Sequence, residues 1–119
     1  MTDREMPPPG PERDALIATL IMGWRRGPEI CHGKQCFIDS GPLHHWPELL
    51  GFSTDPHAAT DVRHQMRELG WRVQVTLFED GKVLAQFWSE DESFEAFTDD
   101  EAAAVTEAAI LAMWAKLEV

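Results

Sequence analysis

Residues 71–88 decide the fold and read WRVQVTLFEDGKVLAQFW. The first seven residues alternate apolar and polar side chains, which is the pattern of a strand with one buried face, and residues 83–88 form a returning strand. The Asp80-Gly81 pair between them favours a tight turn, because both residues tolerate the backbone conformations that hairpin turns need. The sequence therefore predicts an antiparallel β-hairpin.

Large apolar residues also occur on the second face of this hairpin. Phe78, Leu84 and Trp88 fall outside the alternation that predicts the buried face. We therefore expect the second face to be partly covered as well.

Two helices are predicted before the hairpin. Apolar residues recur at three- and four-residue spacing in residues 14–24, which predicts a first helix that the Gly27-Pro28 pair ends. Residues 53–56, Ser-Thr-Asp-Pro, carry side chains that cap helical N–H groups, followed by a proline tolerated in a first turn. They predict the start of a second helix, which Gly70 ends in a left-handed cap.

A last helix is predicted after the hairpin. Thr98 and Glu101 have the spacing of a capping box, with Thr98 as the cap, and apolar residues continue almost to the C-terminus. Ile110 and Trp114 widen the apolar stripe beyond what one sheet face needs. Together with Trp88 they are candidates for a binding or dimer surface, unless the last helix is simply buried on more than one side.

These segments predict a single α+β domain with helices packed on a small, mostly antiparallel sheet. Residues 35–38 supply a short strand and residues 89–97 a polar loop, so the expected order is α-β-α-β-β-α. Residues 1–12 are expected to form a proline-rich N-terminal arm, because proline lacks the N–H group that helices and sheets require. Residues 13–119 then form the domain, and this length suits a single domain.

The chain is acidic, and its charge is unevenly distributed. There are 21 Asp and Glu against 10 Lys and Arg, a formal net charge of -11. Residues 79–119 hold 11 acidic and 2 basic residues, a net of -9. Such a surface repels phosphate groups, which argues against direct nucleic-acid binding, and it complements a basic protein surface. The alternative is that the charge only maintains solubility.

The acidic residues that would bind such a partner all follow the hairpin: Glu90, Asp91, Glu92, Glu95, Asp99, Asp100 and Glu101. They are contiguous in one loop and one helix start. Carboxylates that work in acid–base catalysis instead converge on a pocket, usually from separate elements. We therefore assign no catalytic residue and interpret these acids as a solvated or partner-binding surface.

Weak candidates for a metal site lie within fifteen residues of one another: Cys31, His32, Cys36, His44 and His45. Cysteine and histidine are the ligands that zinc prefers. The Cys-x4-Cys spacing is looser than that of a Cys-x2-Cys knuckle, and one half of the usual pattern is missing. We therefore expect no metal and no other cofactor.

Four short motifs follow one another in a set order: Met22-Gly23-Trp24, Phe52-Ser53-Thr54-Asp55 with Ala58-Ala59, Leu69-Gly70-Trp71, and the alanine-rich segment from Glu101 to Ala112. Together they resemble the phage ABA sandwich domain family, which consists of small phage and prophage proteins with helices around a sheet. The likeness covers residues 13–115; the Cys/His segment and the proline arm depart from the family pattern. It implies a phage or prophage origin and brings no catalytic residues with it.

We therefore expect a small acidic phage accessory protein that acts by non-enzymatic binding to a host protein. Its most specific form is an anti-CRISPR-like inhibitor that mimics the charge of nucleic acid. No apolar run approaches the roughly 20 residues that span a bilayer, and residues 1–6 have no signal-peptide core, so we expect the cytoplasm of a bacterial host cell. Two alternatives stay open: a small-molecule or zinc-binding domain centred on the segment from Cys31 to His45, and a homo-oligomeric scaffold such as a homodimer.

Overall fold

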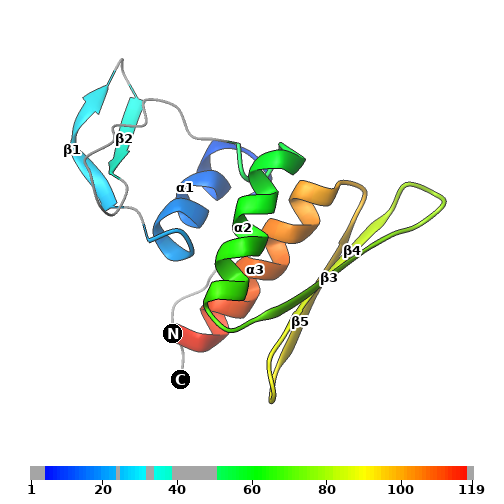
Figure 1. Ribbon diagram of the computed structural model, residues 1–119. Helices are drawn as coiled ribbons and strands as arrows, with labels where there is room; N and C mark the ends of the chain where they lie inside the picture. The colour runs from blue at the N-terminus through cyan, green and yellow to red at the C-terminus, as the bar shows by residue number, and fades with distance from the viewer. Residues whose placement is uncertain (1–4, 24, 32–33, 39–50, 118–119) are drawn as a thin grey trace.

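The computed structural model describes residues 5–23, 25–31, 34–38 and 51–117; for Pro11 and residues 25–31 and 34–38 it describes the backbone alone. The elements are α1 (Pro11–Leu20), β1 (Arg25–Cys31), β2 (Lys34–Ile38), α2 (Pro56–Glu68), β3 (Arg72–Leu77), β4 (Val83–Trp88), β5 (Ser93–Thr98) and α3 (Glu101–Leu117) (Figure 1). This order confirms the predicted α+β class.

The predicted hairpin is the centre of the main sheet. β3 pairs with β4 in antiparallel register from Arg72 opposite Trp88 to Leu77 opposite Val83. Gly81 has a φ of +87°, and Asp80 Oδ1 accepts a hydrogen bond from the Lys82 N–H at 3.0 Å. The hairpin prediction is therefore confirmed, turn included.

A third strand, β5, replaces the polar loop expected over residues 89–97, so that prediction was wrong. β5 pairs with β4, which makes β4 the central strand of the order β3-β4-β5. The Ser89 N–H donates to the Glu92 carbonyl at 2.9 Å and closes the turn between the strands. Buried Ala96 alternates with exposed Glu95 and Phe97, so the segment has the two-residue period of a strand despite its acidic composition.

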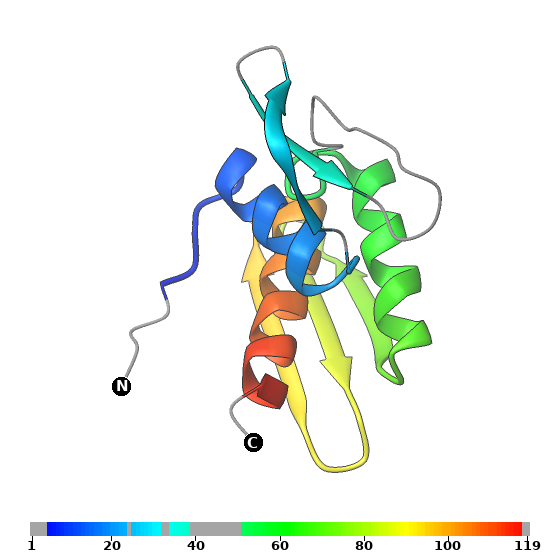
Figure 2. The same cartoon turned by 90° about the vertical axis from the view of Figure 1, so that its left-hand side faces the viewer.

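The alanine-rich helix α3 lies in the middle of the core. It packs on β4 and β5 with one side, while α2 packs beside it and α1 contacts it from the side away from the sheet (Figure 2). Nine of its residues are buried: Ala102, Ala103, Ala104, Val105, Thr106, Ala108, Ala109, Ile110 and Ala112. Small side chains let several elements approach one helix closely, which explains an apolar surface wider than one sheet face needs.

The start of α3 differs from the predicted capping box. The helix begins at Glu101, and Asp100 Oδ2 accepts a hydrogen bond from the Ala103 N–H at 2.9 Å. Thr98 instead exchanges hydrogen bonds with the backbone of Asp100, at 2.7 and 3.1 Å. Asp100, not Thr98, is therefore the residue that caps the helix.

The second helix forms as predicted. Asp55 Oδ1 accepts a hydrogen bond from the His57 N–H at 2.9 Å, Pro56 occupies the first turn, and the helix buries Ala58, Ala59, Val62 and Met66. Gly70 follows it with a φ of +100°. These features follow directly from the cap and spacing signals in the sequence.

The first helix begins and ends earlier than expected. It spans Pro11–Leu20, so Pro11 and Glu12 belong to α1 and not to the arm, because proline is tolerated in the first turn. The Gly27-Pro28 pair does not end it. That pair lies within β1, where the register with β2 shifts between Arg26 and Ile30, an irregularity that suits a residue without an N–H group.

A buried arginine joins three parts of the chain. Arg13 is 3% exposed; its Nε donates to the Pro7 carbonyl at 2.8 Å, and its Nη1 donates to the Ala103 carbonyl at 3.1 Å and lies 3.4 Å from Thr106 Oγ1. Its Nη2 lies 3.7 Å from a carboxylate oxygen of Glu107. Burial lowers the pKa of the Arg13 guanidinium, an effect that Glu107 and Asp14 partly offset. Arg13 thus fastens the N-terminal arm and α1 to α3.

The neighbouring Asp14 is buried as well and holds the loop before α2. Asp14 Oδ1 accepts hydrogen bonds from the Ser53 N–H at 2.7 Å and from the Ser53 hydroxyl at 2.6 Å. Ser53 Oγ also accepts from the Gly10 N–H at 2.8 Å. Two adjacent residues of α1 therefore bind different parts of the chain: Arg13 binds α3, and Asp14 binds the loop that leads into α2.

Replacing Arg13 should destabilise the fold well beyond the loss of its ion pair. We expect Arg13→Met to lower the free energy of unfolding by about 2–4 kcal/mol, because the hydrogen bonds of a buried charged donor are lost. Glu107→Gln should cost less than about 1 kcal/mol, since that pair is long and one-third exposed. Urea unfolding followed by circular dichroism measures both; equal losses in the two variants would contradict the assignment.

The cap of α3 can be tested with two adjacent aspartates. Asp100→Ala should cost about 1 kcal/mol, the usual value of an N-cap hydrogen bond. Asp99→Ala removes the same charge from an exposed neighbour and should cost only a few tenths of a kcal/mol, through the helix dipole. The same urea titration compares them, and a loss for Asp99→Ala as large as that for Asp100→Ala would contradict the assignment of the cap to Asp100.

Candidate functional site

One face of the β3-β4-β5 sheet is turned away from α3, and we call it the open face. Residues directly opposite one another in antiparallel strands share a face, so the pairing gives three rows across it. The rows are Arg72–Trp88–Ser93, Gln74–Gln86–Glu95 and Thr76–Leu84–Phe97. The alternate residues of β4, Val83, Ala85 and Phe87, are buried against the core. None of the described elements covers the open face, so this side of the sheet is available to other molecules.

Exposed aromatic side chains lie at one end of the open face. Phe97 is 59% exposed and Phe78, just beyond β3, is 44% exposed. Their rings pack edge to face with centroids 5.7 Å apart, and Leu84 adjoins Phe97 in the third row. The prediction that the second face would be partly covered is thus wrong for Phe78, while Leu84 and Trp88 are half-buried.

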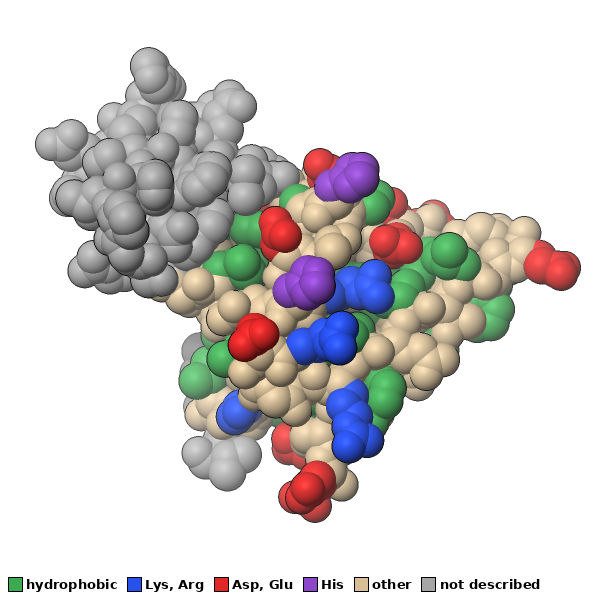
Figure 3. All heavy atoms as spheres, in the orientation of Figure 1, with side chains coloured by type: hydrophobic (Ala, Val, Ile, Leu, Met, Phe, Trp, Pro, Cys, Tyr) green, Lys and Arg blue, Asp and Glu red, His purple; other side chains and the backbone are tan. Residues whose placement is uncertain are grey.

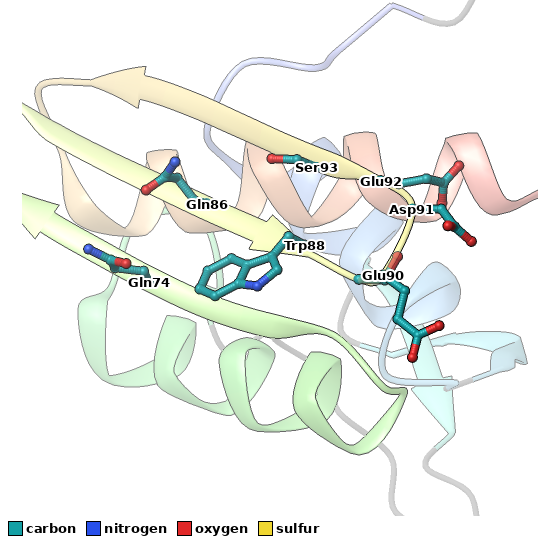
Figure 4. A pocket seen from close by; sticks show the side chains of 8 residues that line it. Gln74, Gln86, Trp88, Glu90, Asp91, Glu92 and Ser93 are labelled. Atoms are coloured by element: carbon teal, nitrogen blue, oxygen red, sulfur yellow. The ribbon is translucent and has the colours of Figure 1, made fainter.

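The other end of the open face is concave. A concavity of about 500 Å³ is lined by residues 88–93 together with Gln74 and Gln86. In Figure 4 the Trp88 indole reaches from β4 over β3, with Gln74 on one side and the Glu90 side chain on the other, while Asp91 and Glu92 project from the far side of the turn. The concavity thus combines one aromatic ring, two amides and three carboxylates.

The seven acids predicted to bind a partner do not form one cluster. Glu90, Asp91 and Glu92 form the β4–β5 turn, and Glu95 lies in the middle row of the open face, where Gln86 Nε2 donates to its Oε2 at 3.3 Å. Asp99, Asp100 and Glu101 lie at the far end of β5, about 20 Å away for a strand of this length. Asp100 caps α3, so its carboxylate already has a structural role.

The three residues predicted as an interface have different positions. Ile110 is fully buried in the core, so its placement on an outward surface was wrong; α3 is buried on more than one side, the alternative that the sequence left open. Trp114 is half-buried and packs against the core. Trp88 lies on the open face and lines its concavity.

The candidate metal ligands are mostly outside what the structure describes. Cys31 ends β1 and Cys36 lies in β2, with only their backbones described, and His32, His44 and His45 lie outside the described residues. Among the described side chains, no group of three or more His, Cys, Asp or Glu could hold a metal ion. The zinc-binding alternative therefore stays an open hypothesis.

Basic side chains gather on a different part of the surface. Figure 3 shows Lys and Arg side chains over α2 and the start of β3, where the chain carries Arg63, Arg67 and Arg72. Of these, Arg72 belongs to the open face, opposite Trp88. The exposed Asp61 and Glu68 lie on the same helix as Arg63 and Arg67, so this part of the surface carries charges of both signs.

Sequence reasoning missed the aromatic pair of the open face. Phe78 follows the first predicted strand of the hairpin, and Phe97 lies in the segment predicted as a loop. The signal that could have located it is the alternation of Phe94, Ala96 and Thr98 with Glu95 and Phe97, which predicts a strand once the acidic residues are allowed on its exposed side.

The described part of the chain contains no helix with the length and apolar content needed to cross a bilayer. No protein-family model and no curated protein sequence matches the chain. A solved structure does: a phage protein from Bacillus cereus ATCC 14579 aligns with 92% of this chain and 95% of its own, with a TM-score of 0.65 and 20% sequence identity. The described helices all lie on one side of the sheet, so the sandwich implied by the family resemblance is not confirmed. What the likeness shows is a fold shared with a phage protein.

Proposed function

We propose that this protein is a non-enzymatic binding protein of phage or prophage origin that engages a basic surface of a bacterial host protein. The observation that carries the proposal is the open face, where exposed aromatic side chains and carboxylates lie together outside the core. The fold shared with a phage protein supports the origin. Its site of action would be the cytoplasm of the host cell.

The two kinds of side chain on the open face would have different roles. Carboxylates at the β4–β5 turn and at Glu95 steer a basic partner toward the face and disfavour acidic ones. Phe78 and Phe97 supply large, rigid apolar area, and such residues carry much of the binding energy in protein interfaces. Charge thus sets the rate and selectivity of association, and the aromatic pair resists dissociation.

In its most specific form, the proposal makes the protein a counter-defence inhibitor of the anti-CRISPR type. Carboxylates at both ends of β5 would occupy positions that a basic groove offers to phosphate groups. This form requires a partner that handles nucleic acid.

The proposal can be tested with two charge-matched triple variants. Glu90→Gln, Asp91→Asn and Glu95→Gln neutralise the acids of the open face, whereas Glu5→Gln, Asp61→Asn and Glu68→Gln neutralise exposed acids elsewhere with the same total charge change. In a tagged pull-down from host lysate, the first triple should retain about tenfold less partner than the wild type, and the second should retain it fully. Raising the salt concentration should release the partner from the wild type.

Equal retention by the two triples, or equal loss, would show that the open face is not the binding surface. Circular dichroism should show the same unfolding midpoint for both triples within a few degrees, so that a loss of binding is not a loss of folding. A further variant, Phe97→Ser, removes an exposed ring and should speed dissociation more than it slows association.

The counter-defence form makes a separate prediction. A short duplex or RNA that the captured partner binds should compete with this protein for it, because both would occupy the same basic groove. Fluorescence anisotropy of labelled nucleic acid, titrated with wild-type protein and then with the open-face triple, measures the competition. Simultaneous binding of nucleic acid and protein would exclude charge mimicry while leaving the binding function in place.

A further inference from the structure

The concavity at the Trp88 end of the open face brings together groups that recognise a cation. The half-buried Trp88 indole offers a ring face, Glu90 offers a carboxylate, and Gln74 and Gln86 offer amide oxygens from neighbouring strands (Figure 4). Tryptophan is the best aromatic partner for a cation, and a carboxylate strengthens the contact through charge-assisted hydrogen bonds.

We propose that this concavity binds the guanidinium group of an arginine side chain. The inference rests on the proposed function, because the partner would supply the arginine. The concavity would then be an anchoring pocket within the open face, at the opposite end from the aromatic pair of Phe78 and Phe97.

The shape of the site selects arginine among cations. A guanidinium is planar, so it stacks on one indole face while its N–H groups point outward in the ring plane, toward the carboxylate and the amide oxygens. Lysine places a compact charge that makes fewer directed hydrogen bonds here. Quaternary ammonium groups bind in cages of several aromatic rings, whereas the described lining of this concavity contains one, Trp88.

The net charge of the concavity is negative, which favours the binding of a further cation. Arg72 lies opposite Trp88 in register but does not line the concavity, which three carboxylates do. One positive charge at the edge therefore meets three negative charges, so an incoming guanidinium finds a net attraction beside the half-buried indole ring.

The test uses purified protein and three peptides that differ in one side chain: acetyl-Gly-Arg-Gly-amide and its lysine and citrulline counterparts. Citrulline keeps the shape of arginine and removes the charge. The ¹⁵N-labelled protein is titrated by NMR, with the Trp88 indole N–H signal assigned from Trp88→Leu. The arginine peptide should move this signal and those of Gln74 and Gln86, with affinity at least about threefold above lysine, and citrulline should leave them in place.

Two glutamates at opposite ends of the sheet supply the matched control. Glu90→Gln should weaken the arginine peptide about three- to tenfold, because a carboxylate that bonds the cation is lost. Glu79→Gln removes the same charge from the exposed β3–β4 turn and should change the affinity less than about twofold. The affinities of the three peptides are compared on the wild type, and Trp88→Leu serves only to assign the indole signal; the Gln74 and Gln86 signals report on the same concavity even where Trp88→Leu disturbs the sheet.

Movement of the Trp88 signal by citrulline as much as by arginine, no movement at all, or equal weakening in Glu79→Gln and Glu90→Gln would each overturn the pocket. Failure of the pocket differs from failure of the proposed function. A partner captured through the open face without any arginine-peptide effect rejects the pocket alone, whereas peptide binding with no partner captured supports the pocket and rejects the function.

Discussion

The burial of α3 on more than one side is the constraint on which the rest of the structure depends. Its alanines allow the sheet and the other two helices to approach it together, and a larger side chain there would force them apart at a cost of about 1–3 kcal/mol. Since α1 and α2 also lie on the α3 side of the sheet, the opposite face receives no described helix. The surface we assign to binding is thus a consequence of how the core is built.

Hydrophobic contact alone would not fix how α1 sits on α3, because it has no preferred direction. The directed hydrogen bonds of Arg13 to the carbonyls of Pro7 and Ala103 supply that direction, and Asp14 does the same for the loop at Ser53. Burying two charged groups is costly unless each is fully bonded. Here each charge meets donors or acceptors from a different segment, so one turn of α1 joins the arm, α3 and the entry to α2.

Local signals predicted the elements that local chemistry determines. The Asp80-Gly81 turn, the Asp55 cap and the alternation in β3 depend on neighbours in sequence, and all were predicted. The errors arose where tertiary context decides. Ile110 is expected at the surface only if α3 packs against a single element. The acidic segment that forms β5 predicts a loop unless β4 is known to pair with a second strand. The concavity beside Trp88 joins residues from all three strands, so spacing within one strand could not reveal it.

Part of the acidic composition has a structural role. Asp14 binds Ser53, Asp55 and Asp100 cap helices, and Asp80 closes a hairpin turn, so part of the acid content serves the fold. On the open face, Glu95 lies beside the exposed Phe97 along β5, and the acids of the β4–β5 turn lie beside the half-buried Trp88. In the proposed function, the carboxylates would select basic partners over acidic ones and guide their approach, while shape and the rings would distinguish one basic partner from another.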